Sequence, residues 1–315
     1  MKNVQRYAGI VSLLLLISVP GAAGETGGER IRVATYNLEN YNLTDRLVNG
    51  VYRFDYPKPE SEKHALRRII TEIRPDVLAV QEIGPMPFLL ELQRDLRREG
   101  IDYRHAALLE DADPVRKVAV LSRIPFREVK RHTDMSFLYF EDREMVRRGL
   151  LEVRFDTAGI EWALFTLHLK SKWTERPDDP RATRRRIAEA HTVRNRIRAS
   201  FPETEGHAFL VAGDFNDTRG TAAVRRFLEV GGRPITAIVP AVDSRGETWT
   251  QFWEREEVYS RVDFILASPA MRPIIVPGSG RVVDLPQWRE ASDHRMVYVD
   301  LEFTVTEGAE ELHPD

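Results

Sequence analysis

The sequence predicts one α/β domain in which two β-sheets pack face to face and helices lie outside them. Short runs in which apolar and polar residues alternate indicate strands, and runs with helical spacing follow individual strands. No repeat and no Pro- or Gly-rich break divides the 315 residues, although the length would also fit two average domains. With 42% hydrophobic residues, the chain can build a large core.

The periodicity places the elements in order along the chain. Ile31 and Val33 lie on one side of the opening strand. Leu66 and Ile70 lie on one face of a helix that stops at Pro75. We expect strands at residues 31–37, 76–81, 117–122, 148–155, 160–168, 207–212, 261–267 and 295–303. We expect helices around residues 66–73, 89–96, 181–200 and 221–229.

The first 23 residues have the layout of a secretory signal peptide. Lys2 and Arg6 precede an apolar run at 8–19, and small residues continue to Gly24. The run is too short to span a bilayer comfortably, although an uncleaved N-terminal anchor is the alternative. We therefore expect a secreted or periplasmic protein with a signal peptide at 1–23, a folded domain at 30–305 and an acidic, solvated tail at 306–315.

The composition narrows the classes of protein. Loss of residues 1–23 removes two positive charges and no negative one, which takes the formal net charge from −3 to −5. Nucleic-acid-binding proteins usually have a basic balance or a basic face, so the net charge gives no general support for one and leaves room only for a local basic groove. The absence of Cys excludes a Cys nucleophile, a thiolate metal site and a lipid anchor on Cys.

Polar side chains that could take part in catalysis or metal binding follow the ends of several predicted strands, where rigid scaffolds usually present functional groups. They lie in four short stretches: YNLEN at 36–40, VQE at 80–82, GDFND at 213–217 and SDH at 292–294. Each stretch also has an ordinary explanation. Glu82 can form a salt bridge with an Arg, GDFND can be a turn with capping side chains, and a lone His is more often structural.

Two further polar residues lie in predicted apolar strands, one inside its strand and one at the end. Asp263 stands in the run RVDFI, where its carboxylate could orient an imidazole. His168 closes the run LFTLH and could equally be a hydrogen-bonded histidine of the core. Taken together, the carboxylates and amides suit a hard cation such as Mg²⁺ or Mn²⁺. Hydrolysis of a phosphate ester needs such a cation, a positioned water and help for the leaving group.

In this order, these residues resemble the endonuclease/exonuclease/phosphatase superfamily, which includes pancreatic-type deoxyribonucleases, abasic-site exonucleases, sphingomyelinases and inositol-polyphosphate 5-phosphatases. The matching motifs are TYNLEN (35–40), LAVQE (78–82), VLSRIP (120–125), LHLKS (167–171), VAGDFND (211–217), RVDFILAS (261–268) and SDH (292–294). Each is weak alone, but together they span almost the whole chain after the signal peptide. The resemblance implies a four-layer α/β sandwich with two packed, mostly antiparallel sheets flanked by helices.

The resemblance also implies a metal site and a role for each ligand. Glu82 would be the principal ligand of Mg²⁺ or Mn²⁺, with Asn37 beside it, and Asp293 would serve the same site. Whether one ion or two take part stays open.

The catalytic residues implied by the resemblance are His168, Asp214, Asn216, Asp263 and His294. Asp214 would activate the attacking water, and Asn216 would hold a phosphate oxygen. His294 would stabilise the charge of the transition state while Asp263 orients its ring. His168 would face the phosphate from the opposite side.

The substrate is less well indicated. Abasic-site enzymes have Asp where this chain has Glu39, and they commonly have Trp where it has Ser260, so an abasic-sugar pocket is not expected. Seven Arg residues at 181–198 could line a phosphate backbone or form a solvated helix face. The run MSFLYF at 135–140 could be an exposed loop that touches a membrane or a buried strand.

Three hypotheses of function follow. The first is a metal-dependent phosphodiesterase, a monomer acting on nucleic acid outside the cytoplasm. The second is a sphingomyelinase-like lipid phosphodiesterase or a phosphatase of small esters. The third, a binding protein that has lost catalysis, is disfavoured because every motif position carries a competent side chain. Arg147 or Arg148 would reach the phosphate, and the sequence does not choose between them.

Overall fold

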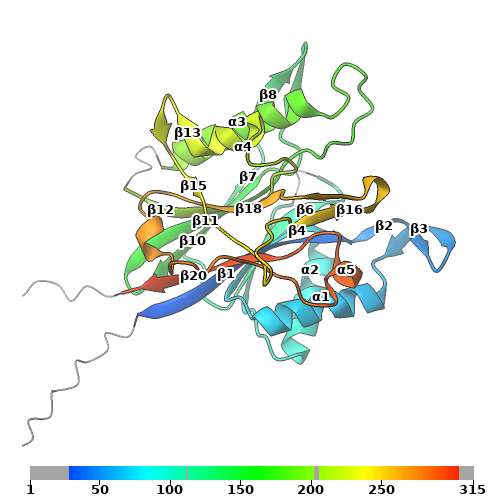
Figure 1. Ribbon diagram of the computed structural model, residues 1–315, viewed down its shortest axis with the longest axis horizontal. Helices are drawn as coiled ribbons and strands as arrows, with labels where there is room; N and C mark the ends of the chain where they lie inside the picture. Colours follow the sequence, from blue (N-terminus) through cyan, green and yellow to red (C-terminus); the bar gives the residue numbers. More distant parts are fainter. Residues whose placement is uncertain (1–27, 111–112, 202–205, 305–315) are drawn as a thin grey trace, which may run out of the picture.

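The computed structural model describes residues 28–110, 113–201 and 206–304. There the chain forms two six-stranded sheets that lie face to face, with helices on their outer faces (Figure 1). The expected four-layer α/β sandwich is confirmed. The predicted signal peptide and acidic tail lie outside the described residues.

The first sheet contains both ends of the folded domain, since β1 and β20 pair antiparallel. Its strands, in spatial order, are β19 (Arg281–Val282), β20 (Val297–Phe303), β1 (Glu29–Tyr41), β4 (Val77–Ile83), β6 (Lys117–Ser122) and β5 (His105–Leu108). The second sheet runs β15 (Ala237–Ile238), β18 (Asp263–Ala267), β12 (Ala208–Asp214), β11 (Ile160–His168), β10 (Leu150–Thr157) and β7 (Glu128–His132).

One parallel pair of strands in each sheet positions the candidate site. β1 pairs parallel with β4 in the first sheet, and β11 pairs parallel with β12 in the second. A parallel pair needs a long crossover, which α1 (Glu60–Ile73) and α3 (Thr183–Ser200) provide. Because parallel strands end at the same edge of a sheet, Asn37 lies beside Gln81 and His168 beside Asp214.

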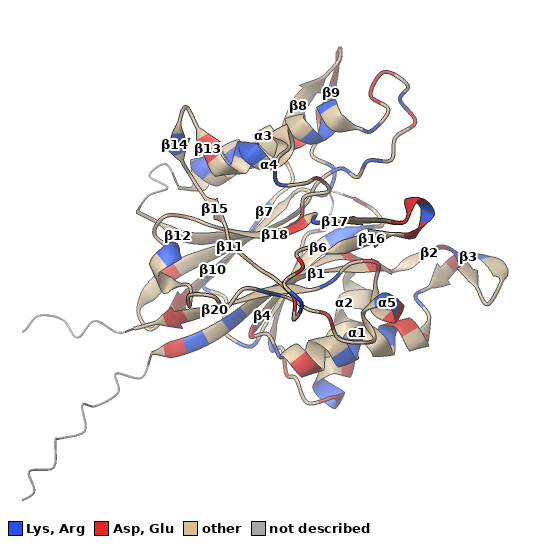
Figure 2. Cartoon of the chain, viewed as in Figure 1, with Lys and Arg blue, Asp and Glu red and all other residues tan. Residues whose placement is uncertain are grey.

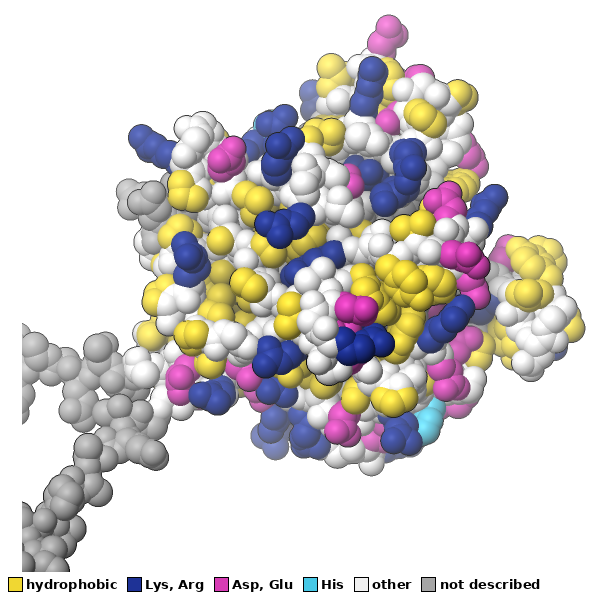
Figure 3. Space-filling view, viewed as in Figure 1, with side chains coloured by type: hydrophobic (Ala, Val, Ile, Leu, Met, Phe, Trp, Pro, Cys, Tyr) yellow, Lys and Arg dark blue, Asp and Glu magenta, His cyan; other side chains and the backbone are white. Residues whose placement is uncertain are grey.

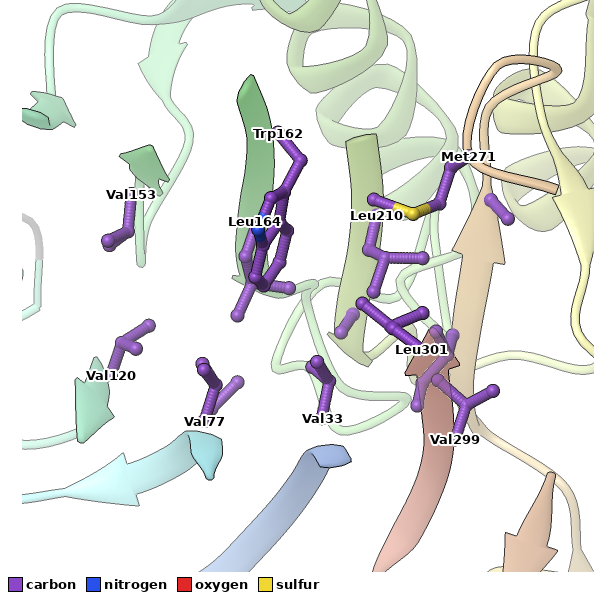
Figure 4. Close-up of a cluster of buried hydrophobic side chains, with 14 of the residues drawn as sticks. Val33, Val77, Val120, Val153, Trp162, Leu164, Leu210, Met271, Val299 and Leu301 are labelled. Atoms are coloured by element: carbon purple, nitrogen blue, oxygen red, sulfur yellow. The ribbon is translucent and has the colours of Figure 1, made fainter. Parts of the chain in front are cut away.

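The main core lies between the two sheets. Figure 4 shows Val33, Val77 and Val120 of the first sheet facing Trp162 and Leu164 of the second. These side chains come from alternate positions of their strands, which is why the sequence shows a period of two there.

Two smaller clusters cover the outer faces of the sheets. α1, α2 (Met86–Arg98) and α5 (Trp288–Ala291) pack on the first sheet, and α3 and α4 (Ala222–Leu228) pack on the second. Leu66 and Ile70 are fully buried on α1, as their spacing predicts. The helix ends one residue before Arg74, which has a left-handed backbone (φ 52°) and is followed by Pro75.

In the described part of the chain, four two-stranded hairpins accompany the two sheets, together with short 3₁₀ helices at Glu254–Glu256 and Arg272–Ile274. The hairpins are β2–β3 (Leu43–Val48, Val51–Pro57), β8–β9 (Ser136–Tyr139, Asp142–Met145), β13–β14 (Glu229–Val230, Arg233–Pro234) and β16–β17 (Gln251–Trp253, Val258–Ser260). The sequence analysis missed β2–β3. Its signal was Asn49-Gly50 between two strand-like runs, the pair favoured in tight hairpin turns because both residues tolerate positive φ.

Two segments of the chain differ in detail from the predicted elements. The strand expected at 261–267 begins at Asp263, so this carboxylate opens the strand rather than interrupting it. In the run 135–140, Phe137 and Tyr139 are buried in β8, whereas Leu138 is 69% exposed. Of the two explanations for that run, the buried strand is therefore correct for most of its apolar side chains.

The Arg-rich helix α3 is not a uniformly solvated face. Arg186 and Arg194 are buried, and the Arg186 Nε donates a hydrogen bond to Asp217 Oδ2 at 2.9 Å. This ion pair ties α3 to the loop after β12. In the described parts of the chain, no helix is both long and apolar enough to cross a membrane.

Gly213, the first residue of the stretch GDFND, belongs to a strand and not to a turn. It lies inside β12 with φ 147°, and a Cβ atom there would come within 2.1 Å of the Leu167 carbonyl oxygen on β11. Only glycine allows β11 and β12 to pair this closely just before they present His168 and Asp214.

Candidate active site

The site lies where the ends of β1 and β4 in one sheet meet the ends of β11 and β12 in the other. Asp214 is its centre. Its side chain is 1% exposed, and its Oδ2 accepts hydrogen bonds from Asn37 Nδ2 and Asn216 Nδ2, both at 3.1 Å. The contact with Asn37 joins the two sheets. Burial of the Asp214 carboxyl raises its pKa, so this group can take up a proton near neutral pH.

His294 and Asp263 form a buried pair beside Asp214. His294 Nδ1 lies 2.8 Å from Asp263 Oδ2, and His294 Nε2 lies 3.9 Å from Asp214 Oδ2. Although burial of the ring opposes its charge, the carboxylates of Asp263, Asp293 and Asp214 hold the pKa of His294 well above its usual value. The ring is therefore a protonated donor whose Nε2 points toward the carboxylates of the site.

His168 occupies the opposite side of Asp214. Its Nε2 lies 3.4 Å from Asp214 Oδ2, and its Nδ1 is buried without a hydrogen-bond partner among the described residues. Burial and the nearby Arg148 guanidinium keep the pKa of His168 well below its usual value. Asp214 thus stands between one neutral and one charged imidazole.

Glu82 lies at the rim of the same group. Its backbone is left-handed (φ 60°), and its Oε2 accepts a hydrogen bond from Asn40 N at 3.0 Å. Its other oxygen lies 3.9 Å from His168 Nε2. The salt bridge considered for Glu82 exists as a loose contact, 3.7 Å from Arg116 Nε.

A further carboxylate extends the acidic region on the side of Asp293. Glu39 Oε2 accepts a hydrogen bond from Asp293 N at 3.1 Å, and Gln251 Nε2 lies 3.5 Å from Asp293 Oδ2. Burial together with the neighbouring Asp293 charge raises the pKa of Glu39. The buried Lys58, 3.7 Å from the Glu39 carboxylate, balances only part of this charge.

The donor set fits a hard divalent cation. Glu39, Glu82, Asp214 and Asp293 bring several oxygen ligands to one region. Burial raises the pKa values of Asp214 and Asp293, and the neighbouring charges of Glu82 and Asp263 raise them further, a repulsion that a cation would relieve. Asp214, Asp263 and His294 also have ligand atoms within 4.8 Å of one another. However, the short contact of His294 with Asp263 already uses one nitrogen and one oxygen of that trio in a hydrogen bond.

A model of the endonuclease/exonuclease/phosphatase family matches residues 34–294, which include every candidate residue of the site. The chain belongs to this family. No curated protein sequence matches the chain.

Solved structures show the same fold at low sequence identity. The chain is similar to the human Nocturnin catalytic domain with bound sulfate (16% identity, TM-score 0.61, covering 87% of this chain and 95% of that one). It is also similar to D. rerio TDP2 complexed with single strand DNA product (18%, 0.57, covering 86% and 98%). A third is sphingomyelinase C from Streptomyces griseocarneus (16%, 0.59, covering 87% and 99%). Family members are phosphoester hydrolases that depend on divalent metals. The similar structures include one bound to DNA and one sphingomyelinase, so they do not indicate a single class of substrate.

The structure brings all eight candidate residues of this family member into one region. Asn37, His168, Asn216 and His294 surround Asp214 within 3.9 Å. The other three candidates contact members of this group. Asp263 and Asp293 lie beside His294, with Asp293 3.9 Å from its Nε2, and Glu82 lies beside His168.

The two arginines between which the sequence does not choose lie in different surroundings. Arg148 is buried, contributes to the low pKa of His168 and lies 3.5 Å from Asp113. Arg147 is half exposed and bonds Asp113 Oδ2 at 3.0 Å. Arg148 therefore adds positive charge beside His168.

Sequence reasoning missed Arg116 and the part played by Glu39. Arg116 bonds Asn40 Oδ1 at 2.8 Å and so contacts the loop after the first motif. No local pattern marks it. Glu39 belongs to the motif TYNLEN, but the motif does not predict its contact with Asp293, which lies more than two hundred residues away in the sequence.

Proposed function

We propose that this chain is a Mg²⁺- or Mn²⁺-dependent phosphodiesterase that acts on nucleic acid outside the cytoplasm. The observation that carries the proposal is the placement of Asp214 within 3.9 Å of the His294 ring. A carboxylate with a raised pKa and an imidazole held charged by Asp263 supply a proton acceptor and a proton donor at one point. Hydrolysis of a phosphodiester needs both.

The roles follow from the contacts. Asp214 accepts the proton of the attacking water. Asn216 orients that carboxylate, since its Nδ2 donates to Asp214 and to the Leu169 carbonyl, and it would exchange one of these hydrogen bonds to hold a phosphate oxygen. The charged His294 faces the phosphoryl oxygens, where negative charge builds up. His168 and Arg148 close the opposite side.

Glu82, Asn37 and Asp293 are the residues that would hold the cation, with the Glu39 carboxylate close to Asp293. A bound Mg²⁺ or Mn²⁺ would neutralise phosphoryl charge and lower the pKa of a water. Oxygen ligands without any thiolate match the preference of these ions.

The test is hydrolysis of bis(p-nitrophenyl) phosphate and of a labelled oligonucleotide by the purified chain, with Mg²⁺ and with chelator. We expect activity that disappears with chelator and returns with Mg²⁺ or Mn²⁺. An Asp214→Asn variant keeps the size of the side chain and should lose turnover. Activity that survives chelation, or that survives Asp214→Asn, would overturn the proposal.

A lipid phosphodiesterase is the second candidate, because the β2–β3 hairpin carries large exposed apolar side chains. Leu47, Tyr52 and Phe54 are 72%, 58% and 75% exposed. Apolar side chains presented on a projecting hairpin are a common means of contacting lipid. Faster hydrolysis of sphingomyelin vesicles than of oligonucleotides would favour this candidate.

A further inference from the structure

A pocket of about 530 Å³ opens directly beside the candidate active site. Its walls come from two segments that project on the same side of the molecule, the loop after β11 and the β16–β17 hairpin (Figure 1). A volume of this size falls in the usual range for pockets that bind small molecules.

The pocket is continuous with the catalytic residues. Asn216 and Gln251 both line it. Asn216 also donates to Asp214, and Gln251 lies 3.5 Å from the Asp293 carboxylate. A substrate whose scissile phosphate lies at Asp214 therefore extends one neighbouring unit into this pocket.

Two tryptophans line the pocket and remain open to solvent. Trp173, from the loop after β11, is 68% exposed, and Trp253, from β16, is 39% exposed. Large flat side chains that remain exposed in a concave site offer a surface on which a ligand can stack. Tryptophan faces bind flat aromatic rings, and they also bind quaternary ammonium groups.

The charge of the pocket separates these two kinds of ligand. Lys172, Arg181 and Arg255 line it against a single acidic side chain, Glu256. Among the described residues, none of these three cations forms an ion pair, although many other arginines of this chain do. Outside the pocket the charge is mixed: the tip of the β16–β17 hairpin carries acidic and basic residues in Figure 2, and both kinds of side chain lie on this side of the molecule in Figure 3. Because cations outnumber the acidic side chain in the lining itself, the pocket repels a choline group and attracts a further phosphate.

We propose that this pocket binds an unpaired nucleobase of single-stranded nucleic acid, with the tryptophans stacking on the base and the cations holding the adjoining phosphate. The inference rests on the proposed function, since it places the scissile phosphate at Asp214. A base inside a duplex is paired and stacked, and it cannot turn its face to these tryptophans. The pocket thus selects single strands over duplexes and over lipid head groups.

The experiment measures binding separately from hydrolysis. A labelled single-stranded ten-nucleotide deoxythymidine oligomer and an equally long abasic (tetrahydrofuran) oligomer of the same charge are titrated into the purified chain in EDTA. Wild type should bind the thymidine oligomer roughly 5- to 150-fold more tightly, the range expected for stacking of one base. Trp173→Ala and Trp253→Ala should remove most of this preference, and Trp173→Phe should restore part of it.

Charge variants and a control complete the design. Arg181→Gln and Arg255→Gln should weaken both oligomers alike and flatten the dependence of affinity on salt, because each phosphate contact contributes to that slope. Leu138→Ala, another exposed apolar side chain, lies outside this pocket and should change neither affinity.

Each outcome decides one of the two proposals. Equal affinity of wild type for the thymidine and abasic oligomers, or a preference unchanged by both Trp→Ala variants, overturns the pocket assignment even if hydrolysis occurs. Tighter binding of duplex or of sphingomyelin vesicles than of the single strand overturns it as well. A base preference lost in the tryptophan variants, in a chain that hydrolyses neither substrate with Mg²⁺, would sustain the pocket and overturn the catalytic proposal.

Discussion

Replacement of His294 by Asn separates a catalytic role of the His294–Asp263 pair from a structural one. Asp263 is 1% exposed and its Oδ1 has no hydrogen-bond partner in the described structure, so His294 carries most of its stabilisation. Alanine at 294 would leave this carboxylate buried and unpaired, at a cost of about 3–5 kcal/mol in the free energy of unfolding. Asparagine has its Nδ2–H where His294 Nδ1 contacts Asp263, so it keeps that donor but removes the Nε2 proton that faces the phosphate.

The expected loss is in turnover. Removal of one preorganised donor to a developing oxyanion lowers kcat by about a hundredfold or more, or roughly 3 kcal/mol of transition-state stabilisation. Melting of His294→Asn should change much less, because the buried hydrogen bond to Asp263 persists. The assay is kcat for bis(p-nitrophenyl) phosphate in saturating Mg²⁺, divided by the folded fraction from circular dichroism.

The fold supplies a matched control. His132 on β7 and Glu152 on β10 form a second buried pair, in which His132 Nε2 lies 2.8 Å from Glu152 Oε2. His132→Gln keeps a donor at the position of Nε2, so it should change melting little and leave turnover per folded molecule unchanged. If His294→Asn turns over as fast as His132→Gln, the pair at 294 is structural and the reasoning fails.

Four further predictions follow from other parts of the chain. Glu82→Gln should raise the Mg²⁺ concentration needed for half-maximal activity at least about tenfold, as loss of a ligand charge does; an unchanged Mg²⁺ titration would remove Glu82 from the ligands. Hydrogen bonds from His132, Arg154 and Ser200 outweigh the effect of burial and lower the pKa of Glu152 to about 2, so its stabilisation is complete above the unfolded value near 4.5 and is lost as pH falls toward 2. The melting temperature of Glu152→Gln should accordingly fall less than that of the wild type as the pH is lowered. An equal fall in both proteins would contradict the role given to Glu152. Gly213→Ala should cost roughly 3 kcal/mol of stability because its Cβ meets the Leu167 carbonyl oxygen, whereas Gly220→Ala, with no atom within 4 Å, should cost little; equal melting points would refute this. Mass spectrometry of exported protein should find an N-terminus near Gly24, and retention of Met1 would instead indicate an anchor.

Local pattern in the chain was sufficient to predict two packed sheets with helices outside them, and the motifs at strand ends marked the candidate residues. Alternation in strands such as β1 and helical spacing in α1 reflect which face of each element is buried, and that information repeats every few residues. The motifs at strand ends were readable for the same reason, since Asp214 directly follows the apolar run of β12. Hairpin β2–β3 was equally local, and its Asn49-Gly50 turn was overlooked rather than hidden.

Contacts between distant segments depended on how the two sheets pack. Asn37 meets Asp214 across 177 positions, and only the face-to-face packing of parallel strand ends brings them within 3.1 Å. The same packing buries Arg148 and leaves Arg147 half exposed, a choice that two adjacent identical residues could not reveal. The tryptophan pocket likewise needs two loops some eighty residues apart to project side by side. Burial, electrostatic shifts and pocket shape arise from neighbours in space, and a one-dimensional pattern does not contain them.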